Sequence, residues 1–77
     1  MIKLQKFEVV KMVLSDSISA AYTVSNDNGH KVTFSAKGDV AGLVLVTQKG
    51  AIKEFKTLDA VRSFMQSVGI KSFSVCG

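Results

Sequence analysis

Proline and tryptophan are absent from this chain of 77 residues, and cysteine and histidine each occur once. A single cysteine cannot build a disulfide framework, so we expect packing or a partner to hold the fold together. Long apolar runs are also missing: the longest is residues 40–46, whereas a membrane-spanning helix needs about twenty residues. These absences exclude a disulfide-rich secreted scaffold and a helical membrane protein.

The remaining composition is that of a folded protein. Hydrophobic residues make up 47% of the chain and charged residues 21%, a balance that argues against disorder. The length and the lack of any linker predict a single domain over residues 1–77. Lysines are spread among the first apolar residues instead of preceding them, unlike in a signal peptide, so we expect a cytoplasmic protein.

Alternation of apolar and polar residues predicts strands over most of the chain. Residues 2–14 are interpreted as a strand whose alternation changes phase, which suggests a bulge or two short strands. Residues 18–25 and 30–36 form a hairpin, and a three-residue loop at 27–29 pairs Val24 with Val32 and gives Gly29 a left-handed conformation. The apolar face of the first hairpin strand then consists of Ile18, Ala20, Tyr22 and Val24.

The second half of the chain begins with residues 41–48, a strand apolar on both faces, as is typical of a central strand. A turn at Lys49-Gly50 leads to a more polar strand at 51–56. Thr57 is a good N-cap and Gly69 a good C-terminal cap for a helix between them. Residues 71–75 alternate again as a short final strand. One side of this helix carries Leu58, Val61, Phe64, Met65 and Val68.

The predicted order is β-β-β-β-β-α-β, an α+β fold with a mainly antiparallel, twisted sheet of five to six strands and one helix packed on one face. One helix covers only one face of such a sheet. The other face must therefore curl on itself, stay polar, or meet a second molecule.

Residues for catalysis or metal binding are sparse. The only histidine, His30, is expected at the exposed hairpin turn, and Cys76 lies next to the last residue. The six acidic residues are isolated or at turns, and neither a metal-ligand spacing nor a glycine-rich phosphate loop occurs. We therefore expect no catalytic residue, no metal site, no cofactor and no enzymatic activity.

The net charge of +4 is unevenly distributed, since residues 49–77 hold five of the ten basic side chains but only two of the six acidic ones. Basic side chains alternate with Phe55 and Phe73 there, a pattern suited to phosphates and unpaired bases. The alternatives are lysines that protect a sheet edge, aromatics that pack under the helix, and a pair of Arg62 with Asp59. The candidate nucleic-acid-binding residues are Lys49, Lys53, Lys56, Arg62 and Lys71.

The segment from Lys53 to Val75, with the pattern F-K-T-L-D-A, F, G-I and F-x-V, is similar to the strand–helix–strand end of short proteins encoded on bacterial plasmids and other mobile elements. This resemblance implies a small accessory or regulatory protein and brings no catalytic residues with it. Two hypotheses follow. The first is a non-enzymatic protein that binds single-stranded or duplex nucleic acid, and the alternative is a self-associating or protein-binding module without a nucleic-acid role.

Overall fold

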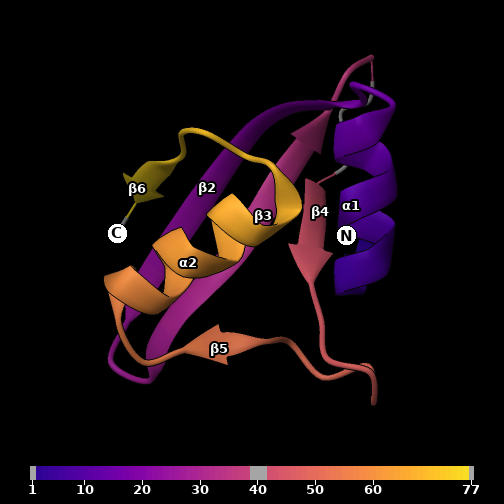
Figure 1. Ribbon diagram of the computed structural model, residues 1–77. Coiled ribbons are helices and arrows are strands. Elements are labelled where there is room, and N and C mark those ends of the chain that lie inside the picture. The colour runs from indigo at the N-terminus through magenta and orange to yellow at the C-terminus, as the bar shows by residue number, and fades with distance from the viewer. Residues whose placement is uncertain (1, 39–41, 77) are drawn as a thin grey trace.

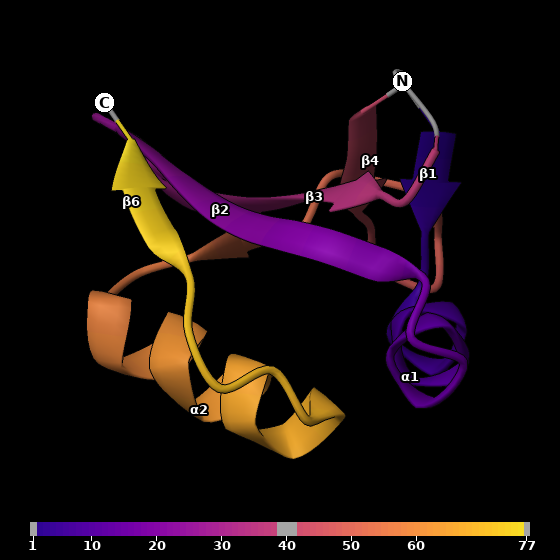
Figure 2. The same ribbon diagram turned by 90° about the horizontal axis from the view of Figure 1, so that it is seen from above.

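The computed structural model describes residues 2–38 and 42–76, which form one mixed sheet with two helices on one side of it (Figures 1 and 2). The α+β class, the number of strands and the mainly antiparallel pairing are as the sequence predicts. The number of helices and the extent of the first strand differ from the prediction. The elements are β1 (Ile2–Leu4), α1 (Lys6–Leu14), β2 (Ile18–Asn26), β3 (Gly29–Ala36), β4 (Gly42–Leu45), β5 (Glu54–Phe55), α2 (Leu58–Val68) and β6 (Ser74–Cys76).

The strand predicted over residues 2–14 is wrong beyond Leu4, because residues 6–14 form helix α1. The backbone N–H of Gln5 donates to the Glu8 side chain (3.0 Å), half of a capping box at the start of this helix. The change of phase in the apolar alternation of residues 2–14 reflects the 3.6-residue period of a helix. Val9 is fully buried, and Met12 and Val13, three and four residues later, pack on the core.

The sheet has the strand order β1-β4-β3-β2-β6, with parallel pairs at its two edges and antiparallel pairs between them. The prediction of a central strand within residues 41–48 is confirmed for β4, which lies between β1 and β3 with Leu43, Val44 and Leu45 buried. It is wrong for residues 46–48, where Val46 forms only an isolated bridge to Ile52. Residues 39–41 lie outside the described part of the chain.

The register of the β2–β3 hairpin differs from the prediction. The connecting turn has two residues, with Asn26 opposite Gly29, so Val24 pairs with Lys31 instead of Val32. The Asn26 side chain accepts from the Asn28 backbone N–H (2.8 Å), an Asx turn that fixes this shorter loop. Gly29 does have a positive φ (140°).

As a result, the face of β2 that packs into the core is the opposite of the predicted one. Ala21 and Thr23 are buried beside Phe34 and Val32, their partners on β3, while Val24 is 38% exposed. A bulge between Ile18 and Ala20 adds a further shift at the start of β2. Ala20, Tyr22 and Val24 of the predicted apolar face are thus on the side of the sheet that no helix covers (Figure 2). That side also carries Lys31, Thr33, Ser35 and Ser74. Ile18, which precedes the bulge, still packs against the core.

Helix α2 matches the sequence closely. The Ala60 backbone N–H donates to the Thr57 hydroxyl (3.1 Å), and Gly69 ends the helix in a left-handed conformation. The Ile70 N–H donates to the Met65 carbonyl (2.8 Å), the Schellman ending that the Gly-Ile pair indicates. The core therefore lies between the sheet and two helices. Its buried members are Leu4, Val9, Ala21, Val32, Phe34, Leu43, Leu45, Val61, Met65 and Val68.

Candidate functional site

An apolar groove of about 590 Å³ opens between α1, the segment that joins β4 to β5, and one side of α2. We call it the α1 groove. Helix α1 and its N-cap form one wall, residues 45–48 and Lys53 form another, and Phe64 closes it from α2. The lining residues are Gln5, Lys6, Phe7, Val10, Leu45, Val46, Thr47, Gln48, Lys53 and Phe64.

The groove exists because the sheet edge is interrupted. Strands β4 and β5 pair with the same edge of β3, β4 opposite residues 33–35 and β5 opposite residues 30–31. Residues 46–53 leave the sheet between them and fold into a small hairpin, in which Val46 bridges Ile52 and the Thr47 N–H donates to the Ala51 carbonyl (2.7 Å). This excursion lies below α1 in the view of Figure 1. Its residues 46–48 and Lys53 line the groove.

The α1 groove is electrically positive. Lys6 and Lys53 line it, and none of its lining residues is acidic. The ammonium of Lys53 lies 5.5 Å from the centre of the Phe55 ring, and that of Lys11 lies 5.6 Å from the centre of the Phe7 ring. Cations held over aromatic rings gain a modest attraction and remain able to contact an anion.

A second groove, of about 460 Å³, lies on the side of α2 that faces β6, and we call it the α2 groove. Arg62 and Lys71 line it, again without an acidic residue. In the described part of the chain the one ion pair joins Lys37 to Asp16, so the Arg62–Asp59 pair considered from the sequence does not form. The α1 groove and the α2 groove are therefore each lined by two cations and no carboxylate. A third groove, at the C-terminal end of α2, shares Lys71 but is also lined by Asp16.

The five basic residues selected from the sequence are not brought into one cluster. Lys53 lines the α1 groove, and Arg62 and Lys71 line the α2 groove. Lys49 is exposed in the turn of the 46–53 excursion, and Lys56 is exposed between β5 and α2. Neither of these two lines either groove.

The aromatic partners also differ from those the sequence indicates. Phe55 packs on Phe64, with 5.6 Å between ring centres, and Phe73 packs against the core, so the alternative of aromatics under the helix is the one the structure supports. The exposed ring is that of Phe7, at 57%. Lys6 and Phe7 were missed because the strand prediction for residues 2–14 gave them no relation to residues 53–64. The signal that could have found α1 is the Gln5–Glu8 spacing, three residues apart before an apolar run.

One histidine contact was not expected. The Ser25 hydroxyl and His30 Nδ1 are 2.7 Å apart across the hairpin, where the two residues face each other. Nucleophilic catalysis also needs a group that orients the imidazole, and among the described residues no side-chain hydrogen bond to His30 other than that of Ser25 is found. The pair ties the end of the hairpin together. Cys76 is exposed on β6.

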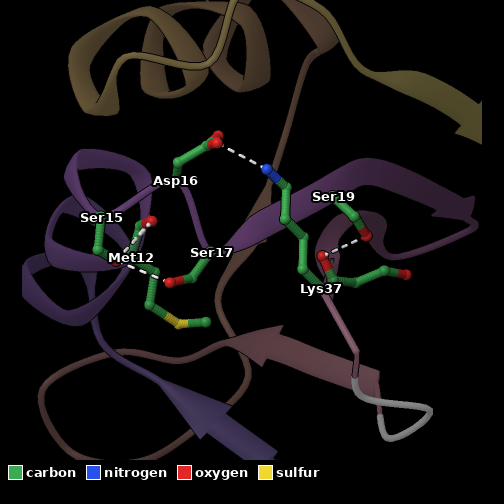
Figure 3. Close-up of polar contacts among 7 residues, drawn as sticks. Met12, Ser15, Asp16, Ser17, Ser19 and Lys37 are labelled. Carbon is green, nitrogen blue, oxygen red and sulfur yellow. Dashed lines mark hydrogen bonds and ion pairs between the residues drawn. The ribbon is translucent and has the colours of Figure 1, made fainter.

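A polar cluster joins the end of α1 to the strands that follow it (Figure 3). The Lys37 ammonium is 2.6 Å from Asp16, and the hydroxyls of Ser15 and Ser17 are 2.7 Å apart. Lys37 and Asp16 are 54% and 86% exposed in their side chains, so the pair contributes little to stability. The cluster is part of the turn that ends α1.

Over residues 2–38 and 42–76, no group of three or more histidine, cysteine, aspartate or glutamate side chains is placed to hold a metal ion. Neither helix of the described chain has the length and apolarity that crossing a membrane requires. Comparison with protein families, with curated proteins and with solved structures gave no match.

Proposed function

We propose that this protein is a small, non-enzymatic, cytoplasmic accessory protein that binds single-stranded nucleic acid on the side of the sheet that carries the helices. The observation that supports this most directly is the pair of grooves that flank α2, each with two cations and no acidic lining residue. An accessory role also agrees with the resemblance of residues 53–75 to proteins of plasmids and other mobile elements.

Phosphates are the ligands that such a surface favours. Lysine and arginine side chains release condensed counterions from a nucleic acid when they neutralise its phosphates, so affinity falls as salt rises. A phosphate chain that follows both grooves would meet Lys6 and Lys53 on one side of α2 and Arg62 and Lys71 on the other. Two separated pairs of cations suit an extended polyanion better than a compact one.

The salt dependence of binding tests this proposal. For single strands the logarithm of the binding constant falls with the logarithm of salt concentration with a slope of about −0.7 per phosphate contact. Four contacts give a slope of about −2.8, a loss of about 50-fold in affinity between about 50 mM and 200 mM salt. Fluorescence anisotropy with a labelled single-stranded oligonucleotide measures both quantities.

Charge-neutralising variants locate the surface. Lys53→Gln and Arg62→Gln, one from each groove, should each make the slope shallower by about 0.7. Lys3→Gln is the matched control: it removes the same charge from an exposed position on the uncovered side of the sheet, since its neighbour Leu4 points into the core. Absence of binding at about 50 mM salt, or a Lys3→Gln effect as large as that of Lys53→Gln, would contradict the proposal.

A second candidate function is self-association, because α1 carries an exposed apolar stripe. Phe7 and Leu14, seven residues apart and therefore on one side of the helix, are 57% and 81% exposed. A second copy of the chain packed on this stripe would bury both side chains. Sedimentation equilibrium over a range of concentrations tests this: a dimer has twice the mass of the 8.3 kDa chain, and Leu14→Lys should return it to the monomer.

A further inference from the structure

We infer that the α1 groove is the binding site for one unpaired nucleobase. The base stacks on the Phe7 ring while its flanking phosphates contact Lys6 and Lys53. This inference rests on the proposed nucleic-acid function and assigns a role to one of its two grooves. The α2 groove then holds only the phosphate chain.

The shape and lining of the groove suit a flat aromatic ligand. A volume of about 590 Å³ is within the range of small-molecule sites. Aromatic rings line it from two elements, Phe7 from α1 and Phe64 from α2. Phe64 is held in place by its contact with Phe55, so that side of the groove is formed before any ligand arrives.

Phe7 is the ring best placed for stacking. It is more than half exposed, although the aromatic side chains of a small domain usually provide much of its core. Lys11 lies over one face of the Phe7 ring, which leaves the other face for a base, and the cation adds to the attraction for the base and its phosphate. A base placed on Phe7 would bury the apolar surface that the free protein leaves in water.

The polar groups of the groove complete the match. Lys6 belongs to the α1 wall and Lys53 to the wall formed by the 46–53 excursion, so each of the two phosphates that flank a base would have its own cation. The Gln5 side-chain amide makes one long hydrogen bond, 3.4 Å, to the carbonyl of Gln48, a bond weak enough to exchange for a base edge. Because stacking is available to every base, we expect little sequence preference.

The test uses three DNA probes of equal length: a single strand, a single strand whose residues are abasic, and a duplex. Phe7→Ala should weaken binding of the single strand by about five- to 100-fold, as removal of a stacking side chain does. Binding of the abasic strand and of the duplex should change by less than about twofold, since their phosphate contacts are untouched. Leu14→Ala is the matched control, an exposed apolar residue of the same helix that does not line the groove.

Because the chain contains no tryptophan, the fluorescence of a single introduced tryptophan can report directly on the groove. Phe7→Trp keeps an aromatic ring at this position and introduces the only tryptophan of the chain. Its fluorescence should be quenched by the single strand and not by the abasic strand, and its affinity for the single strand should equal or exceed that of the unmodified protein.

The outcomes separate this inference from the proposed function. If the protein binds the single strand and the abasic strand equally well and Phe7→Ala changes neither, the groove holds no base, although the phosphate-binding proposal stands. If Phe7→Ala and Leu14→Ala weaken binding equally, the stripe of α1 serves a protein contact and the inference is wrong. If no probe binds at about 50 mM salt, the proposed function and this inference both fail.

Discussion

Replacing Thr23 by valine should stabilise the protein. Thr23 is fully buried in the middle of β2, between Val32 on β3 and Val75 on β6. Among the described residues its hydroxyl oxygen has no hydrogen-bond partner. Valine has nearly the same shape and replaces the hydroxyl by a methyl group, so the substitution removes a buried polar group without opening a cavity.

The expected gain follows from the cost of an unsatisfied hydroxyl. Burying a polar group without a partner costs about 1–3 kcal/mol, and both side chains are β-branched, so the strand conformation is unaffected. We expect the free energy of unfolding to rise by about 1–2 kcal/mol. Unfolding entropies of about 2.1 cal/mol/K per residue convert each kcal/mol into about 6 °C of melting temperature for a chain of this length.

Urea and thermal unfolding followed by far-ultraviolet circular dichroism measure both quantities. Thr33→Val is the matched control: Thr33 is half-buried on β3, on the uncovered side of the sheet, and among the described residues its hydroxyl is not a buried group without a partner. It should change stability by less than about 0.5 kcal/mol. The reasoning is refuted if Thr23→Val lowers the free energy of unfolding, or raises it by no more than Thr33→Val does. Either result would mean that the Thr23 hydroxyl makes a stabilising hydrogen bond.

Three further substitutions, two at glycines and one at a helix cap, are tested by the same unfolding measurements. Gly29→Ala should destabilise the protein by more than about 2 kcal/mol, because its Cβ would lie 2.7 Å from the Phe55 carbonyl oxygen at a positive φ. Gly50→Ala, at φ 87° in open space, should cost only about 1 kcal/mol; equal losses at the two glycines would mean that β5 moves aside. Thr57→Ala removes the cap of α2 and should cost about 1 kcal/mol, and a neutral result would show that the helix start does not depend on this hydroxyl.

Helix α2 was predictable because its signals are local. A capping threonine, a glycine at the C-terminal cap and an apolar stripe act within a few residues of each other, and the structure has Thr57, Gly69 and the buried side of the helix where the sequence indicates. Leu58 is the exception on that stripe, at 42% exposed. The first turn of the helix extends past the edge of the core.

Helix α1 and the hairpin register were not predictable in the same way. Three of the nine residues of α1 are β-branched valines, which favour strands, and a helix this short is marginal without tertiary contacts. In β2 the apolar alternation points Tyr22 and Val24 inward, yet the two-residue turn and the pairing with Val32 and Phe34 bury Ala21 and Thr23 instead. A shift of one residue in register exchanges the two faces of a strand.

The chain by itself therefore determined the fold class, the second helix with its caps, the central position of residues 42–45 and the excess of positive charge after residue 48. Only the tertiary structure decided which side of β2 is buried and that residues 6–14 form a helix. It also decided that Lys6 and Phe7 line the same groove as Lys53. Helix caps and turns depend on hydrogen bonds between near neighbours. The α1 groove depends on packing between segments that are distant in the sequence, with Lys6 and Phe7 more than forty residues before Lys53, and that packing is determined by the whole core.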